Sequence, residues 1–154
     1  RRAQRPGSAA ESESSFAREL LAAIREITGF GDLEFDNDGD ICLPRRSQMV
    51  FVRRLGATPF VRIWSPLVRG VDETSDLLGH LNSLNASTGL VRFSVHDGVI
   101  FAEADVAAEP IVAKHVDLAL RRFCGATDGV DVMLQRKFGG RTAFIEILPG
   151  ALLH

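Results

Sequence analysis

The regular pattern of the chain begins with apolar residues at helical spacing. They share one stripe of a helix and comprise Phe16, Leu20, Leu21, Ile24 and Ile27. Gly29 follows the stripe, as is typical of a helix end. The pattern therefore predicts a helix over about 14–28. Residues 1–12 hold Pro6, Gly7 and small residues without a hydrophobic period, which predicts a flexible lead-in.

Short apolar segments separated by turn residues follow this helix and predict β-strands. Asp38-Gly39 lies between two such segments within residues 33–43, a pattern typical of a two-residue hairpin turn. Further strands are predicted over 49–54 and 60–65, joined by residues 56–59. We expect Pro66 to end or kink the last of these, because proline cannot donate a hydrogen bond to a strand ladder.

The second half of the chain predicts a helix, a hairpin and a long helix. Acidic and hydroxyl residues over 72–76 precede a leucine stripe, so a helix is predicted over about 74–86. A hairpin over 90–105 follows, with Asp97-Gly98 at its turn.

The last helix is expected to open at Glu109-Pro110, with proline at its first position, and to run to about residue 138. Gly125 and Gly129 should weaken or kink it. Residues 143–148 predict either a final strand or an extended tail.

These elements define an α+β fold. Strands joined by tight turns must be antiparallel, because parallel neighbours need a long crossover. The expected architecture is an antiparallel sheet with helices packed on it, in the order α-ββββ-α-ββ-α. We expect a single domain over 13–148, preceded by the flexible segment 1–12 and followed by a tail over 149–154. A length of 154 residues suits one such domain.

Side-chain alternation along the predicted strands gathers an unusual set of residues on one face. With the turn at Asp97-Gly98, Phe93 opposes Ala102 on the core side, and Arg92 and Phe101 point to the other side. The strands 49–54 and 60–65 alternate in the same way. If the arginine-bearing sides share a face, that face carries Phe51, Arg53, Phe60, Arg62, Trp64, Arg92 and Phe101.

Aromatic residues interleaved with arginine are enriched in protein–protein interfaces, whereas a face that meets only water does not need them. The sequence leaves two readings of this face open. It is covered by the chain's own helix or terminus, or it is a surface for another molecule.

Composition and charge narrow the function classes. Hydrophobic content of 45% and charged content of 25% are ordinary for a soluble globular protein. No apolar run approaches the roughly 20 residues of a membrane span, and no apolar region follows the basic start as in a signal peptide. A net charge of −2 disfavours general affinity for nucleic acid. Cys42 and Cys124 lie far apart and outside metal-ligand spacing, which favours a cytoplasmic protein with free thiols.

Residues able to support catalysis or metal binding are sparse. The acidic run over 36–40 looks like the start of a calcium loop, but Ile41 and Ser47 stand where that pattern needs Gly and Glu. A hairpin turn explains the same residues. Cys42 with a remote histidine is conceivable as a catalytic pair, although a small buried thiol is the simpler interpretation. The histidines show no ligand spacing and are His80, His96, His115 and His154. We therefore predict no catalytic residue, metal or cofactor.

A family resemblance rests on the order of several short motifs. They are Ser65-Pro66-Leu67-Val68 at a strand end, Leu81-Asn82-Ser83-Leu84-Asn85 at a helix end, the Asp97-Gly98 hairpin and a long helix ending at Phe138-Gly139-Gly140. Over roughly residues 30–140 the chain resembles the YbjN family and the actinobacterial YbjN-like peptide-binding chaperones grouped with it, which share the type III secretion chaperone-like fold.

The resemblance implies a fold without catalytic residues. From the secretion chaperones it also implies a dimer that binds extended, partly unfolded segments of client proteins. This chain departs from them because it lacks their strongly acidic balance and has an arginine-rich sheet face. Asn82 and Asn85 are expected to satisfy backbone groups at a helix end.

Three functions are compatible with the sequence. The first is a non-catalytic, cytoplasmic, homodimeric module that binds a protein or peptide client on the aromatic and arginine face or along an edge strand. The second is single-stranded nucleic-acid binding on that face. Aromatic rings flanked by arginine suit the stacking of bases, whereas the net charge disfavours this function. The third, ranked last, is an enzyme using Cys42 or a pair of carboxylates.

Overall fold

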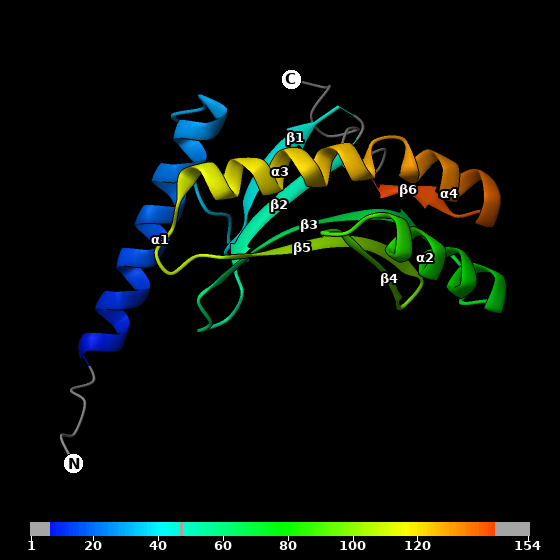
Figure 1. Cartoon of the computed structure of the whole chain (residues 1–154), viewed down its shortest axis with the longest axis horizontal. Helices are drawn as coiled ribbons and strands as arrows, with labels where there is room; N and C mark the ends of the chain where they lie inside the picture. The colour runs from blue at the N-terminus through cyan, green and yellow to red at the C-terminus, as the bar shows by residue number, and fades with distance from the viewer. Residues whose placement is uncertain (1–6, 47, 144–154) are drawn as a thin grey trace, which may run out of the picture.

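A computed structural model describes residues 7–46 and 48–143. The elements in chain order are α1 (Gly7–Thr28), β1 (Ile41–Arg45), β2 (Gln48–Arg54), β3 (Phe60–Arg69), α2 (Ser75–Ser87), β4 (Arg92–His96), β5 (Val99–Ala107), α3 (Ala113–Thr127), α4 (Val130–Phe138) and β6 (Arg141–Thr142). The α+β class and the antiparallel sheet with helices packed on it are confirmed. Figure 1 shows α3 lying along the sheet and α1 crossing one end of it.

The strands form one sheet in the order β1-β2-β3-β5-β4, and the short β6 pairs with the end of β3. Every pairing is antiparallel. The β4–β5 hairpin has the predicted register, in which His96 opposes Val99 and Phe93 opposes Ala102. Its turn residues Asp97 and Gly98 both have positive φ, at 48° and 71°. These angles are those of the tight turn that matches the twist of a hairpin.

The hydrophobic core lies between the helices and one face of the sheet. Alternate strand residues such as Val52, Ile63 and Ile100 are fully buried on that face. The helices cover them with apolar stripes that include Leu20 and Ile24 of α1, Leu77 and Leu81 of α2, Val116, Leu120 and Phe123 of α3, and Leu134 of α4. Because the helices cover one face of the sheet, they form one layer and the sheet forms the other.

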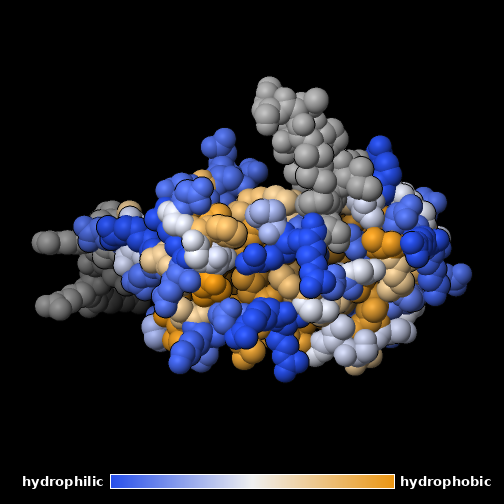
Figure 2. All heavy atoms as spheres, turned by 90° about the horizontal axis from the view of Figure 1, so that it is seen from above, coloured by the Kyte–Doolittle hydropathy of each residue, from blue (hydrophilic) through white to orange (hydrophobic). Residues whose placement is uncertain are grey.

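Figure 2 shows the molecule from above the view of Figure 1. On this side, hydrophilic side chains are interspersed with hydrophobic ones.

The predicted strand at the start of the 33–43 hairpin does not form. Phe35 makes only an isolated bridge with Ile41. The reason lies in Asp36, whose Oδ1 accepts hydrogen bonds from the backbone N–H groups of Asp38 and Asp40, both at 2.9 Å. A side chain that binds the backbone locally competes with a strand ladder, and here the local turn prevails.

Pro66 does not end β3, so of the two expected outcomes, an end or a kink, the structure agrees with the kink. The strand continues to Arg69, and its register against β5 shifts between Pro66 and Val68. The hydroxyl of Ser65 donates to the carbonyl of Met49 at 2.7 Å, which ties β3 to β2 beside the proline. A bulge is one of the few places where a strand tolerates proline, because the ladder is already interrupted there.

Two helix boundaries also differ from the prediction. Helix α1 begins at Gly7, earlier than residue 14. The last helix begins at Ala113 instead of Pro110, because β5 extends to Ala107 and Ala108 donates its N–H to Pro59 at 2.8 Å, which leaves 109–112 as the connection.

The predicted weakening at Gly129 is a complete break, because this residue has φ 74° and separates α3 from α4. Gly125 stays within α3. Of the expected final strand over 143–148, residues 144–148 lie outside the described residues.

Candidate functional site

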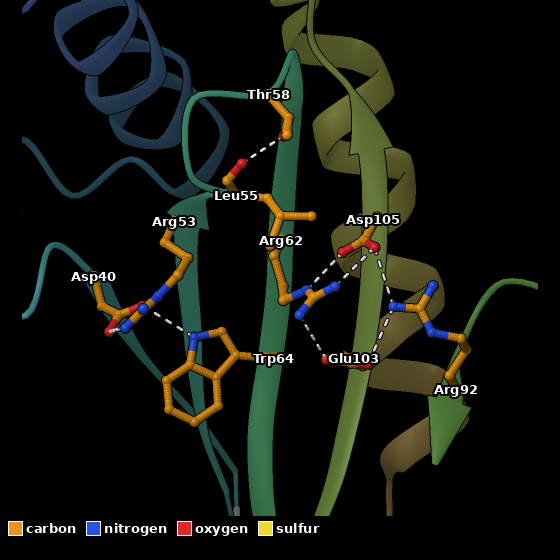
Figure 3. Close-up of polar contacts among 9 residues, drawn as sticks. All are labelled: Asp40, Arg53, Leu55, Thr58, Arg62, Trp64, Arg92, Glu103 and Asp105. Carbon is orange, nitrogen blue, oxygen red and sulfur yellow. Dashed lines mark hydrogen bonds and ion pairs between the residues drawn. The ribbon is translucent and has the colours of Figure 1, made fainter. Parts of the chain in front are cut away.

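The predicted interface residues all lie on the sheet face turned away from the helices. We call this the open sheet face and define it by Phe51, Arg53, Phe60, Arg62, Trp64, Arg92 and Phe101. Strand pairing brings them together across four strands, with Phe51 opposite Trp64 and Arg53 opposite Arg62. Figure 3 draws several of them in front of the strands, with the helices behind. The expectation that the arginine-bearing sides share one face is confirmed.

An aromatic cluster occupies the middle of this face. The rings of Phe51 and Trp64 are stacked, with centroids 4.6 Å apart and an interplanar angle of 22°. Phe101 lies against the other side of Trp64 at 6.2 Å with a tilt of 52°. Each such pair contributes about 0.5–1.5 kcal/mol beyond area burial. The cluster is half-buried, so its rings offer a preformed apolar platform.

Asp40 anchors the edge of the cluster. Its carboxylate accepts a hydrogen bond from Trp64 Nε1 at 3.0 Å and one from Arg53 Nε at 2.7 Å, and Arg53 Nη2 binds its second oxygen. The guanidinium of Arg53 also lies 5.6 Å from the Trp64 ring centroid. Asp40 is 2% exposed, and its hydrogen bonds compensate for that burial. The hydrogen bond to Asp40 raises the pKa of Arg53.

A second charged network lies beside the cluster on β3, β4 and β5. Arg62 binds Asp105 through two nitrogens, at 2.8 and 3.0 Å, and Glu103 at 3.1 Å. Arg92 binds the same carboxylates, Glu103 at 3.1 Å and Asp105 at 3.0 Å. The hydrogen bond from Arg62, aided by Arg92, lowers the pKa of Asp105 despite its partial burial. Figure 3 shows the carboxylates between the two guanidinium groups.

The open sheet face is therefore balanced in charge. Arg53, Arg62 and Arg92 each bind at least one carboxylate of the same face. Phe60 does not join the aromatic cluster, because it lies at the start of β3 opposite Ala107, with Arg62 between it and Trp64. It is 40% exposed and lies at the rim.

The acidic partners were missing from the predicted site. Asp105 follows Glu103 by two residues in the same strand, so alternation would have placed it on this face. Asp40 precedes β1 and lies 24 residues before Trp64, and no local pattern links the two.

Cys42 also lies on the open sheet face, opposite Phe51. Its thiol is half-buried, and burial, followed by the charges of Asp36 and Asp40, raises its pKa. A raised pKa disfavours the thiolate that a nucleophile requires. Among the described residues, no group of three or more His, Cys, Asp or Glu side chains is placed to hold a metal ion.

Asn85 covers the outer edge of β4. Its side-chain Nδ2 donates to the carbonyl of Phe93 at 3.0 Å, and its Oδ1 accepts from the Phe93 N–H at 2.7 Å. The amide thus pairs with a strand backbone as a neighbouring strand would, and not with the helix end that was expected. Asn82 is exposed, and within the described part of the chain its side chain has no hydrogen bond.

Solved structures of similar fold include a chaperone-effector complex and YbjN. The structure of the HopA1-SchA chaperone-effector complex matches with a TM-score of 0.60 and 13% identity, over 74% of this chain and 91% of that one. YbjN from E. coli, described as a putative transcription regulator, matches at 0.57 and 12%, over 76% and 92%. The ExsC-ExsE complex matches at 0.57 and 18%, over 80% and 92%. These likenesses show the fold.

The described helices contain no stretch that is both long and apolar enough to cross a membrane.

Sequence comparison identifies the family more specifically than the shared fold does. A search of curated proteins finds no match. The family model described as T3SS (YopN, CesT) and YbjN peptide-binding chaperone 1 matches residues 15–146. Because that match spans most of the sequence, the chain belongs to the family of T3SS and YbjN peptide-binding chaperones.

Proposed function

We propose that this chain is a non-catalytic module that holds an extended segment of a client protein on its open sheet face. The observation that carries the proposal is the aromatic cluster of Phe51, Trp64 and Phe101, which the chain holds in place but leaves half-exposed. Rigid aromatic anchors are the side chains that most often dominate binding between proteins. Membership of a peptide-binding family supports the same use.

The charges of the face support an apolar client segment over nucleic acid. Binding of nucleic acid draws on cations that can neutralise phosphates. Here Arg53, Arg62 and Arg92 are already held by Asp40, Glu103 and Asp105. Most of the binding free energy of a client would therefore come from its apolar side chains packed on the aromatic cluster, with polar contacts at the rim.

Two finer features belong to the same proposal. We propose that the chain acts as a homodimer, as the resemblance to secretion chaperones suggests, and that it works in the cytoplasm, where its free thiols Cys42 and Cys124 would stay reduced. Light scattering of the purified chain tests the first point. A mass equal to one chain at working concentration would remove the dimer from the proposal.

The test of the binding face is a double substitution, Trp64→Ala with Phe101→Ala. Peptides selected from an array of varied composition would be titrated by fluorescence anisotropy against the wild type and the variant. We expect the double variant to bind about tenfold more weakly or worse, because it removes two anchors and each factor of ten is about 1.4 kcal/mol. Added salt should change the wild-type affinity little, because the face is balanced in charge.

The matched control is Leu78→Ala, which truncates a 51% exposed leucine of α2. It should bind as the wild type does. Since Trp64→Ala also removes a hydrogen bond to Asp40, circular dichroism must show that the variant is folded, and Phe101→Ala alone provides a milder variant. Equal affinity of the wild type and both folded variants would show that the client binds elsewhere.

A further inference from the structure

A groove on the helix-bearing side lies between α3 and the connection from α2 to β4. We call it the α3 groove. Its lining includes Leu90, Leu118, Arg121, Arg122 and Gly125, and it has a volume of about 550 Å³. Leu90 is 45% exposed and Leu118 is 54% exposed, although both are large apolar side chains. Neither contributes to the core on which the fold depends.

The contribution of α3 to this groove follows a helical stripe. Leu118, Arg121, Arg122 and Gly125 lie at i, i+3, i+4 and i+7, so they share one side of the helix. Gly125 creates a notch in that side, because a Cβ placed on it would meet no atom within 4 Å. At this notch, beside the exposed Leu118, an apolar side chain of a partner can approach the backbone of α3 closely.

The rim of the α3 groove is basic, and its charge is only partly compensated. Arg121 binds Asp117 at 2.7 Å, while both side chains remain accessible. Arg122 is exposed, and its guanidinium has no hydrogen bond or ion pair with any residue that the structure describes. Lys114 is exposed one turn before Leu118. This differs from the open sheet face, where every arginine of the set is held by a carboxylate.

We propose that the α3 groove binds a short amphipathic helix of a partner protein that carries apolar residues on one side and acidic residues beside them. The apolar side would enter between Leu90 and Leu118, over the notch at Gly125. The acidic residues would meet Arg122 and Arg121 at the rim. Amphipathic helices commonly bind in grooves of this kind, and the basic rim, whose Arg122 has no carboxylate partner among the described residues, favours an acidic partner by charge complementarity.

A recessed site favours a peptide over a membrane surface. Segments that lie on membranes present apolar side chains that protrude together with basic residues. Here the exposed leucines border a hollow of about 550 Å³ that a flat bilayer would leave unfilled. A second surface of this type goes beyond the client site proposed above and does not depend on it.

The probe is a fluorescein-labelled helical peptide with leucines along one side and glutamates flanking them, compared with the same peptide carrying lysines in place of the glutamates. Gly125→Leu fills the notch while replacing glycine with a better helix former, so it blocks the groove without weakening α3. Arg122→Glu reverses the rim charge. We expect each variant to bind the glutamate peptide at least about tenfold more weakly, and the wild-type affinity to fall with added salt.

The matched control is Arg136→Glu, which makes the same charge change on the exposed side of α4. It should leave binding unchanged. Equal affinity of wild type, Gly125→Leu and Arg122→Glu would overturn the inference. Loss of binding only in the variant with Trp64→Ala and Phe101→Ala would place the peptide on the open sheet face, which refutes this inference and leaves the proposed function intact. Binding of anionic phospholipid vesicles in preference to the glutamate peptide would also overturn it.

Discussion

Asp40 joins side chains that lie far apart along the chain. It accepts hydrogen bonds from Arg53 on β2 and from Trp64 on β3, and it is almost fully buried. The aspartate therefore fixes the orientation of the Trp64 ring, and through it the stacking on Phe51. A buried carboxylate that holds two donors is more consequential than an exposed one, because removing it leaves both donors without their partner.

Asp40→Ala should lower the free energy of unfolding by about 2–4 kcal/mol, since it leaves the indole N–H and a guanidinium without an acceptor. Urea denaturation followed by Trp64 fluorescence measures this. Asp38→Ala is the matched control, because Asp38 is exposed in the same turn. That variant should change stability by no more than about 0.5 kcal/mol. Similar values for both variants would contradict the anchoring role of Asp40.

At the level of elements, the sequence predicts best where a local rule determines the structure. The β4–β5 register followed from Asp97-Gly98, because a two-residue turn determines which residues face each other. Pro66 left two outcomes open, an end or a kink, and the register shift in β3 agrees with the kink. The residues before β1 misled the prediction, because Asp36 binds the local backbone in place of a strand partner.

In the candidate site, too, the features determined by a local rule were predicted and the others were not. Strand alternation placed Phe51, Trp64 and Phe101 on one face, and the structure confirms it. The ion pairs on that face were not predictable in the same way. The pairing of Arg62 with Asp105 spans 43 residues and depends on β3 lying next to β5, which no local pattern in the sequence states.

Asn85 connects α2 to the edge of the sheet, and its substitution tests whether this contact protects that edge. Asn85→Ala should leave the outward N–H of Phe93 without its acceptor and so speed hydrogen exchange at that amide, because the edge of β4 becomes accessible to water. The cost in stability should be about 1–2 kcal/mol. Exchange measured by NMR checks this, with Asn82→Ala as the control on the same helix. Unchanged exchange at Phe93 would show that the Asn85 contact does not protect the edge.

For the whole molecule, two carboxyl groups make the free energy of unfolding depend on pH in opposite directions. Asp131 is 3% exposed, and its Oδ1 has no hydrogen-bond partner among the described residues. Burial raises its pKa, so the folded state holds this proton more tightly than the unfolded state does. Its ionisation therefore lowers stability as pH rises above about 4. Asp105 has a lowered pKa, so its contribution to stability is present above about pH 4 and is lost as pH falls through the folded value.

Asp131→Asn should therefore raise the free energy of unfolding at pH 7 by about 1 kcal/mol, and Asp105→Asn should lower it by about 1–2 kcal/mol. The gap between Asp131→Asn and the wild type should close once pH falls below about 4. The gap for Asp105→Asn should persist to lower pH. Urea denaturation across this range measures both. A destabilised Asp131→Asn variant at neutral pH would contradict the unfavourable burial of that carboxylate.

The amide of Asn85 also limits how copies of the chain can polymerise. Fibres that grow by strand addition need two receptive edges on every molecule, one to give and one to take. Within residues 7–46 and 48–143, the sheet ends at β4, whose backbone Asn85 occupies at Phe93, and at β1, where Phe35 bridges only Ile41. An edge that is blocked at one of its residues is a poorer template for a further strand than an edge without such a block. Edge-to-edge association of this chain should therefore use β1 more readily than β4.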